Sequence, residues 1–291
     1  MSSPDASAGK KPVDYVRRGN YQINYIGALT FVGFRAADPF LQYGVLAQDW
    51  GASLIRAVGG QVRPVGAALV TNTALDSFTL GLSPSRLLLL AMSIGSMLKQ
   101  NYYQLAIMQE EMPFHQGVMV GMLNATLNTL NSTFFIWKGA SSILGNNPSE
   151  DATQPQMVIG FTMFVVGLSI EWLSEVQRTS WKKRPENKGR VYSEGLFGLS
   201  RHVNYFGYTL WRGGYALAGG GWFWGAFVGG LFAWDFRTRA IPVLQDYLRG
   251  KVSRHERSCH VWCYLADHSL QYGKQYEEYE RSVPSLFVPF L

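Results

Sequence analysis

The sequence predicts an all-α fold, a polytopic membrane helix bundle with about seven transmembrane helices, and three observations support this expectation. Hydrophobic residues make up 47% of the chain and charged residues 16%, whereas a typical soluble domain is about 25% charged. The charged residues gather in residues 1–18, 175–190 and 235–281. Long apolar runs separate these segments, and about 17 to 25 apolar residues suffice to cross a bilayer.

The apolar runs mark the expected spans. The first covers residues 25–45, and because it contains Arg35 and Asp38 we expect it to face protein or to break near Pro39. The other runs cover residues 64–82, 85–98, 117–137, 157–173 and 205–240. The last run is long enough for two spans, with a turn at residues 219–221. Together the runs predict six or seven helices.

The charge distribution predicts how the chain is oriented. Residues 1–20 are polar and are expected to form a disordered cytosolic tail without a cleavable signal peptide, followed by a single membrane domain over residues 21–291. Lys and Arg are frequent in the tail and at 178–190, so the positive-inside rule places both on the cytoplasmic side. They account for much of the net charge of +6, and no nucleic-acid partner is required. We expect a multi-pass protein of the endoplasmic reticulum.

Two asparagines in the run at 117–137 match the glycosylation sequon. Asn124 is followed by Ala-Thr and Asn131 by Ser-Thr. Both lie inside an apolar run, so we interpret them as polar residues that pack between helices.

Ionisable residues beside the apolar runs are candidates for function, because a charge at membrane depth is costly and tends to face a cavity or a partner. Tyr103 follows the run at 85–98, and Glu110 and Glu111 come seven residues later. Glu171 and Glu175 are four residues apart and share a helix face. Interfacial helix ends with snorkelling side chains are the alternative for Glu110 and Glu111.

The most informative stretch is residues 200–207, Ser-Arg-His-Val-Asn-Tyr-Phe-Gly, directly at the start of an apolar run. Arg and Asn offer fixed donors, and His changes charge near neutral pH. The basic loop at 175–190 leads into it, and Arg and Lys can neutralise a pyrophosphate or a 2′-phosphate. No G-x-G-x-x-G follows a strand, which argues against a Rossmann domain. The pattern favours a membrane reductase that takes NADPH from solution; a helix cap with an interfacial anchor is the alternative.

Residues 175–217 resemble the core of the DUF1295 family, with a pattern close to D-x-Q-K-x-x-F-K, N-K-G and G-L-W-x-x-S-R-H-P-N-Y-F-G-E, and residues 95–112 resemble its fungal members. This family belongs with the membrane steroid 5α-reductases. The resemblance implies a seven-span bundle that binds NADPH in its cytosolic half and reduces a carbon–carbon double bond of a lipid, such as an enone steroid or enoyl chain. It implies a cofactor pocket formed by Glu175, Arg178, Lys182, Asn187, Arg201, His202, Asn204 and Tyr205.

The expected reaction is hydride transfer to a conjugated double bond, with a tyrosine or a protonated acid polarising the carbonyl group. Tyr103, Glu110 and Glu111 are the candidate catalytic residues. Two positions depart from the family pattern: Val203 replaces its proline and Tyr208 its glutamate. A tyrosine can donate a hydrogen bond but carries no charge.

Two other functions stay open. Arg-His-x-x-Tyr-Phe-Gly followed by Trp211 also resembles the isoprenylcysteine carboxyl methyltransferases, which share this bundle and bind S-adenosylmethionine, although residues 241–246 lack the Glu-Glu pair of those enzymes. The third reading is a lipid-binding relative that lost activity with its glutamate. Binding of NADPH against S-adenosylmethionine would separate the three.

Residues 252–271 interrupt the C-terminal part of the family pattern. They hold four residues of metal-ligating type: His255, Cys259, Cys263 and His268. Their spacing matches no tight zinc motif, so no metal is expected. Joining Lys251 to Tyr272 restores an uninterrupted tail, and we interpret 252–271 as a translated retained intron. The last stretch, residues 276–291, is expected to fold back over the mouth of the bundle.

Overall fold

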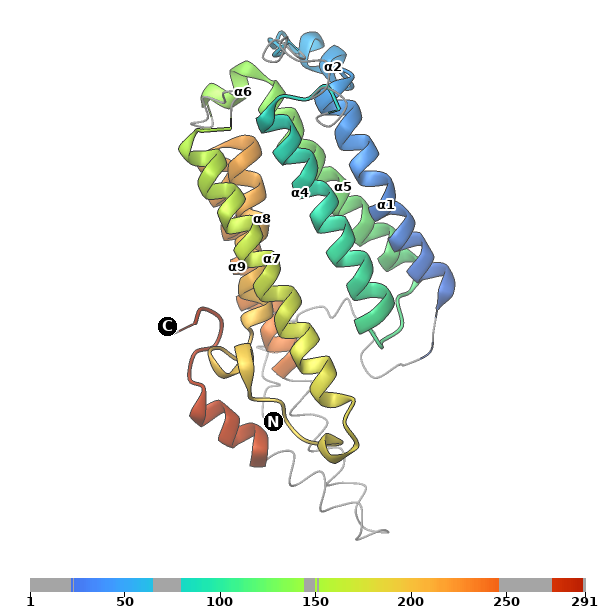
Figure 1. The fold of residues 1–291 in the computed structure, drawn as a ribbon, viewed down its shortest axis with the longest axis vertical. Helices are drawn as coiled ribbons and strands as arrows, with labels where there is room; N and C mark the ends of the chain where they lie inside the picture. The colour runs from blue at the N-terminus through green and yellow to red at the C-terminus, as the bar shows by residue number, and fades with distance from the viewer. Residues whose placement is uncertain are drawn as a thin grey trace, which may run out of the picture.

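The computed structural model describes residues 22, 24–64, 80–143, 150, 152–245 and 274–289. Within these ranges the fold is all-helical, apart from one isolated bridge between Val62 and Trp137. The long helices run side by side as a bundle (Figure 1). They are α1 (Tyr25–Ala47), α4 (Pro84–Tyr102), α5 (Phe114–Ile136), α7 (Pro155–Lys182), α8 (Val203–Gly220) and α9 (Trp222–Asp235).

Shorter elements join the long helices at the two ends of the bundle. At the end shown uppermost in Figure 1 these are α2 (Ala52–Ala57) and α6 (Lys138–Ile143). At the opposite end they are two π-helical turns, η1 (Tyr103–Ile107) and η4 (Phe236–Ala240), two 3₁₀ turns, η2 (Pro185–Asn187) and η3 (Gly195–Gly198), and helical segments at 241–245 and 274–282. We call this lower end the mouth.

The expected helices are found where the described residues allow a test. The runs at 25–45, 85–98, 117–137 and 157–173 lie in α1, α4, α5 and α7, and the run at 205–240 divides into α8, α9 and η4. The run at 64–82 lies mostly outside the described residues, as do the N-terminal tail and residues 252–271. By length and composition, one described helix, α7 with 28 residues, is long and apolar enough to cross a membrane. Seven spans therefore stay a prediction.

Local chemistry explains where several helices begin and end. The side chain of Asn24 caps α1 by accepting a hydrogen bond from the Gly27 amide at 3.0 Å. Ser83 caps α4 in the same way, and Pro84 occupies the first turn, where its missing N–H is no loss. Gly221 separates α8 from α9 with a φ of +86°, a conformation that favours glycine. The expected turn at 219–221 is confirmed.

Helices α7 and α8 approach each other closely because glycines line their contact. A Cβ atom on Gly167 would lie 2.5 Å from the Trp211 amide nitrogen, and one on Gly207 would lie 2.7 Å from the Glu171 nitrogen. The two backbones therefore touch where larger residues would hold them apart. This contact fixes the mouth end of α7 against the start of α8.

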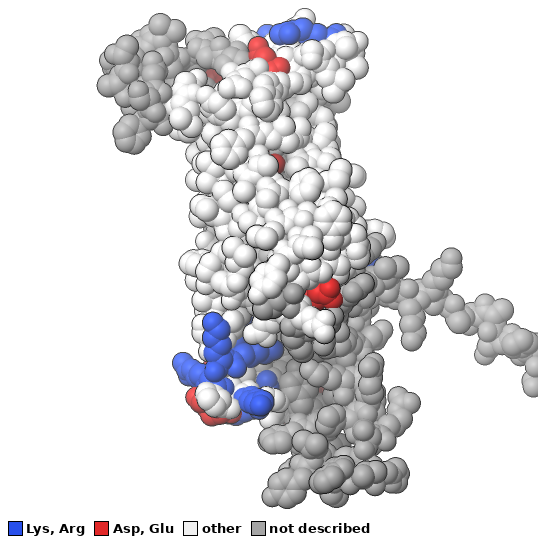
Figure 2. Space-filling model, turned by 90° about the vertical axis from the view of Figure 1, so that its right-hand side faces the viewer, with Lys and Arg blue, Asp and Glu red and all other residues white. Residues whose placement is uncertain are grey.

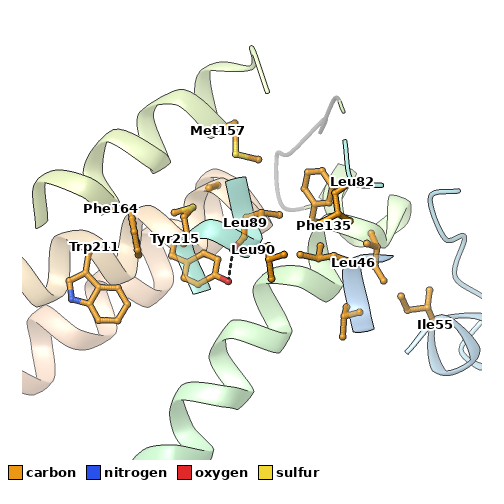
Figure 3. Close-up of a cluster of buried hydrophobic side chains, with 14 residues drawn as sticks. Leu46, Ile55, Leu82, Leu89, Leu90, Phe135, Met157, Phe164, Trp211 and Tyr215 are labelled. Atoms are coloured by element: carbon orange, nitrogen blue, oxygen red, sulfur yellow. Dashed lines mark hydrogen bonds between the residues drawn. The ribbon is translucent and has the colours of Figure 1, made fainter. Parts of the chain in front are cut away.

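The inside of the bundle has an apolar part and a polar part. Leu46, Leu89, Phe135 and Tyr215 belong to the apolar cluster, where the Tyr215 hydroxyl donates to the Leu89 carbonyl at 3.1 Å (Figure 3). Nearer the mouth, charged and amide side chains are fully buried: Arg35, Asp38, Gln42, Asn124, Asn128 and Arg212. α1 does not break at Pro39. It turns Arg35 and Asp38 into the protein, which confirms the other expectation for this run.

The outer surface is apolar between its two charged ends. On the face shown in Figure 2, Lys, Arg, Asp and Glu gather at the ends, and the band between them is almost free of charge. Large apolar side chains are exposed on the long helices, including Val158, Val165 and Leu173 on α7 and Phe227 and Leu231 on α9. Polar residues inside and apolar residues outside are the arrangement that a lipid environment favours.

Candidate functional site

The candidate site lies at the mouth, where the end of α7, the start of α8 and the C-terminal segment meet (Figure 1). The amide of Arg201 donates to the Ser285 carbonyl at 3.0 Å, and the amide of His202 donates to the Leu286 carbonyl at 3.1 Å. The C-terminal segment therefore packs along the motif at 200–207. The expectation that the tail folds back over the mouth is confirmed by these contacts.

Glu175 is the central acidic group of the site. Its side chain is buried near the end of α7. It accepts a hydrogen bond from the Asn204 amide group at 2.8 Å and forms an ion pair with Arg178. The Arg178 guanidinium lies 5.4 Å from the centre of the Phe197 ring. The structure thus brings three of the expected cofactor residues into one cluster, in which the charges of Glu175 and Arg178 balance.

Three flat side chains form a stack beside this cluster. The His202 and Tyr205 rings lie 5.7 Å apart and within 8° of parallel. The Tyr205 and Phe236 rings lie 4.6 Å apart and within 11° of parallel. Phe236 begins the π-helical turn η4, and such turns are frequent at functional sites. We call His202, Tyr205 and Phe236 the aromatic stack.

Several buried polar atoms of the motif lack a hydrogen-bond partner among the described residues. They are the hydroxyl of Ser200, Nε of Arg201 and Nε2 of His202. Burial, together with the positive charges of Arg201 and Arg178, lowers the pKa of His202 to about 4. The imidazole is therefore neutral at physiological pH. Unpaired buried polar atoms are uncommon in folded proteins, and their gathering in one motif favours a ligand site.

The remaining expected cofactor and catalytic residues lie in η1, at the end of α7 and in the loop after it. Tyr103 lies in η1 and interacts electrostatically with Glu175 and Arg178, so it belongs with the cluster. Asn187 donates to the Trp181 carbonyl at 3.0 Å, which shapes the loop after α7. Lys182 is exposed at the end of α7.

The two acidic candidates lie on the other side of the mouth. Glu111 accepts a hydrogen bond from the Asn24 side chain at 3.1 Å, which ties the loop before α5 to the start of α1. Glu110 is half-buried in the same loop. The contacts of Glu111 support the helix-end alternative for this residue, and a catalytic role for the pair stays a prediction.

Residues that the sequence did not single out complete the site. Glu280 pairs with Arg201, and the Tyr279 hydroxyl donates to the Phe197 carbonyl at 2.8 Å. Burial raises the pKa of Tyr279, which keeps this hydroxyl a donor. The mixed acidic and aromatic composition of the tail was the available signal for both. The sequence carried no such signal for Phe236, because the position of this residue depends on the π-helical turn η4.

Tyr208 links the aromatic stack to the interior. Its ring centre lies 5.4 Å from that of Phe236, and its hydroxyl accepts a hydrogen bond from Nε of Arg212 at 3.3 Å. In the sequence pattern of the family, this position is a glutamate. In the part of the chain that the structure describes, no group of three or more His, Cys, Asp or Glu residues could hold a metal ion. The four residues at 255–268 lie outside that part.

Comparisons with known proteins give two results. The family model DUF1295, described as a protein of unknown function, matches residues 132–233. Over 248 residues the chain is 36% identical to "Probable O-methyltransferase ustE" of Ustilaginoidea virens. The aligned region covers 85% of this chain and 87% of that protein. The family match includes all of α7 and α8 and nearly all of α9, and therefore Glu175, Asn204 and Tyr205.

Proposed function

The chain belongs to the DUF1295 family, and from this premise we propose that it transfers a methyl group from S-adenosylmethionine to an oxygen atom of an apolar small molecule. The observation that carries the proposal is the 36% identity with a protein described as a probable O-methyltransferase, over 87% of its length. This similarity favours the methyltransferase alternative over the NADPH-dependent reductase expected first from the sequence. The reductase stays the second candidate, supported by the resemblance of residues 175–217 to the steroid 5α-reductases.

The residues at the mouth fit S-adenosylmethionine. The outer faces of the aromatic stack offer a flat surface for an adenine ring, and aromatic faces attract a cationic sulfonium group. The unpaired atoms of Ser200 and His202 supply polar contacts inside the protein. When bound, the cofactor supplies an electrophilic methyl group. The protein binds and orients the two reactants and excludes water from them.

The charge balance of the motif favours this cofactor over NADPH, while the exposed Lys and Arg residues of the loop after α7 lie at the same end of the bundle. A dinucleotide phosphate carries several negative charges and needs unpaired Arg or Lys residues. The two arginines of the motif region are each paired with a carboxylate, Arg178 with Glu175 and Arg201 with Glu280. S-adenosylmethionine carries a net positive charge, which a neutralised site with aromatic faces accommodates.

The surface of the bundle supports a membrane location for this chemistry. The apolar band of Figure 2 suits the hydrocarbon layer, and the basic residues after α7 suit a headgroup region. An apolar acceptor would then reach the bundle from the bilayer, and the cofactor would reach the mouth from the cytosol. We propose a multi-pass protein of the endoplasmic reticulum with this orientation.

Isothermal titration of the full chain, purified in detergent, tests the proposal. S-adenosylmethionine is expected to bind and NADPH not to bind. Tyr205→Ala should remove the binding because it removes the middle ring of the stack, while Arg56→Gln on α2, at the opposite end of the bundle, should leave it unchanged. Binding of NADPH alone, with its oxidation in the presence of enones, would support the reductase. Binding of neither would support the inactive relative.

A further inference from the structure

Arg212 on α8 is a buried cation that the proposed cofactor site does not use. It is 2% exposed. Its hydrogen bonds go to neutral acceptors: the hydroxyl of Tyr208 at 3.3 Å, Oδ1 of Asn128 at 3.1 Å and Oδ1 of Asn124. Within the described residues no carboxylate lies at ion-pair distance from it. A buried charge without an opposite charge is costly, so an unpaired arginine at this depth requires an explanation.

The nearest carboxylate on α1 is fully engaged by other groups. Asp38 forms an ion pair with Arg35 at 2.9 Å. It also accepts hydrogen bonds from Gln42 at 2.9 Å, Ser93 at 3.1 Å and Asn128 at 2.6 Å. Asn128 stands between the two charges, donating to Asp38 and accepting from Arg212.

The carboxylate on α7 is engaged as well. Glu171 pairs with Lys99 and accepts a hydrogen bond from the Trp211 indole at 2.7 Å. Among the described residues of this region, the cations are Arg35, Lys99 and Arg212, and the carboxylates are Asp38 and Glu171. One positive charge therefore remains.

Aromatic rings hold Arg212 in place without neutralising it. Its guanidinium lies 4.3 Å from the Trp211 ring centre, 5.5 Å from that of Tyr208 and 5.9 Å from that of Phe232.

Arg86 is a buried arginine with a purely structural role, and its contacts differ from those of Arg212. It is equally buried, at 1% exposure, but is paired with Glu150 at 3.1 Å and donates to the backbone carbonyls of Leu46 and Pro64.

The position of Arg212 connects it to the proposed methyl donor. Tyr208 touches both the guanidinium and Phe236, and Phe236 stacks on Tyr205. Arg212 therefore lies directly behind the aromatic stack, on the side that faces the interior of the bundle. A ligand group that reaches Arg212 beside Tyr208 would meet a positive charge and the amide groups of Asn124 and Asn128.

We propose that Arg212 binds the acceptor oxygen as an anion, so that the substrates are apolar molecules with an acidic hydroxyl group, a phenol, an enol or a carboxylic acid, and not aliphatic alcohols. This inference rests on the proposed methyl transfer. A guanidinium cannot accept a proton, Asp38 and Glu171 are engaged, and the lowered pKa of the neutral His202 makes it a weak base. The acceptor must therefore lose its proton readily, to solvent, and the positive charge of Arg212 favours the ionised form.

The proposed step balances in atoms and charge. An electron pair of the acceptor oxyanion forms the new bond to the methyl carbon as the sulfur–carbon bond breaks. The products are a neutral ether or ester and a neutral thioether. The transfer thus removes the negative charge that Arg212 holds, which weakens binding of the product relative to the substrate.

The substitution Asn124→Asp tests the proposal because it supplies the missing carboxylate beside Arg212 with little change in shape. The probe is 4-octyl-2-nitrophenol, whose ionised form absorbs visible light. Bound to the full chain in detergent, its pKa should lie about 1 to 3 units below the value measured in Asn124→Asp, the usual effect of a nearby opposite charge. Arg212→Lys should keep part of the shift, and Arg56→Gln on α2 should keep all of it.

Competition separates the possible acceptors. Decanoic acid, 4-octylphenol and decanol are added to the probe complex, and at least one of the two acids should displace the probe at concentrations where decanol does not. The acid that competes identifies the acceptor type. Equal competition by decanol, or an unchanged probe pKa in a folded Asn124→Asp variant, overturns the proposal.

Two further measurements distinguish a misfolded variant from a failed anion site, and a failed anion site from a failed methyl transfer. Circular dichroism and the thermal midpoint of Asn124→Asp show whether the variant is folded, and Arg212→Gln provides an independent removal of the charge. Titration with S-adenosylmethionine is done on the same samples. If the cofactor does not bind but the probe pKa still depends on Asn124 and Arg212, the methyl transfer fails and the anion site stands. If the cofactor binds and the probe pKa is insensitive, only the anion site fails.

Discussion

Glu175 sets the charge of the mouth because it neutralises Arg178 and holds Asn204. In Glu175→Gln the Arg178 charge is left uncompensated beside the aromatic stack. We expect the affinity for cationic S-adenosylmethionine to fall about tenfold, which is about 1.4 kcal/mol, and any affinity for anionic NADPH to rise. Titration of both compounds measures the two effects, with Glu186→Gln on the exposed loop as the matched control. A tighter S-adenosylmethionine complex in Glu175→Gln would contradict the assigned charge balance.

His202 should make the stability of the protein depend on pH. Its pKa is lowered from 6.5 to about 4 by burial and by Arg201 and Arg178, so the unfolded chain takes up a proton between these values and the folded protein does not. The contribution of neutral His202 to the free energy of unfolding is complete above pH 6.5. It is lost as the pH falls towards 4, and the loss amounts to up to about 3 kcal/mol. The thermal midpoint in detergent should drop over this range in the wild type and stay flatter in His202→Gln. Exposed His115, changed to Gln, should leave the drop intact.

For single residues, the sequence predicted that polar side chains inside apolar helices pack between helices. Asn124 and Asn131 were expected to pack between helices, and this is confirmed: Asn124 accepts from Arg212, and Asn131 accepts from the Trp224 indole at 2.7 Å. A buried amide must find a partner, so burial alone implied the contact. The identity of the partner could not be predicted, because Arg212 lies 88 positions further along the chain.

At the scale of elements, the contact between α7 and α8 should be sensitive to a single methyl group. A Cβ atom on Gly207 would lie 2.7 Å from the Glu171 nitrogen and 2.8 Å from the Gly167 carbonyl oxygen. Gly207→Ala must separate the helices, and we expect a loss of about 1 to 3 kcal/mol together with weaker S-adenosylmethionine binding, as Asn204 moves away from Glu175. Thermal melting and titration measure both.

The control for this contact is Gly33 on α1, which is exposed and would meet nothing within 4 Å. Gly33→Ala should be neutral or stabilising by up to about 1 kcal/mol, because alanine favours the helix. Equal effects of the two substitutions would show that helix propensity, and not the close contact, determines the result.

The C-terminal segment should depend on the pair between Arg201 and Glu280. Arg201→Gln removes this pair and leaves the two backbone hydrogen bonds to Ser285 and Leu286 and the hydrogen bond from Tyr279 to Phe197. The segment should then open more often, and trypsin should cleave after Arg281, which is already exposed, several times faster. Glu277→Gln is the matched control, since its pair with Arg281 is exposed and loose at 4.0 Å. Unchanged cleavage in Arg201→Gln would mean that the remaining contacts of the segment, among them the backbone hydrogen bonds and the Tyr279 hydroxyl, secure it without the ion pair.

The long helices were predictable from the sequence because their apolar runs have the length of a helix that crosses a bilayer. The π-helical turn η4 was not, since its residues, Phe-Arg-Thr-Arg-Ala, carry no local signal for this geometry. Its position follows from packing against α8, where Phe236 meets both Tyr205 and Tyr208. For this reason the motif at 200–205 was predictable, while the third ring of the aromatic stack was not.

At the scale of the whole molecule, the distribution of charge predicts how the bundle lies in a membrane. The polar interior around Arg35 and Arg212 and the apolar band of Figure 2 reverse the pattern of a soluble protein. The mouth holds the basic loop after α7 and the candidate site, and α2 lies at the opposite end. The positive-inside rule then predicts that the mouth faces the cytosol and that α2 lies on the opposite side of the membrane.

Single cysteines test this orientation. In a background with Cys259 and Cys263 replaced by serine, Lys188→Cys marks the loop at the mouth and Val58→Cys the end of α2, and both original side chains are exposed. In sealed microsomes a membrane-impermeant maleimide should label position 188 at once and position 58 only after permeabilisation, because α1 separates the two ends. The reverse pattern would place the cofactor site in the lumen, where S-adenosylmethionine from the cytosol could not reach it. Immediate labelling at both positions would mean that the bundle does not separate two compartments, and the apolar band would then need a protein partner to cover it.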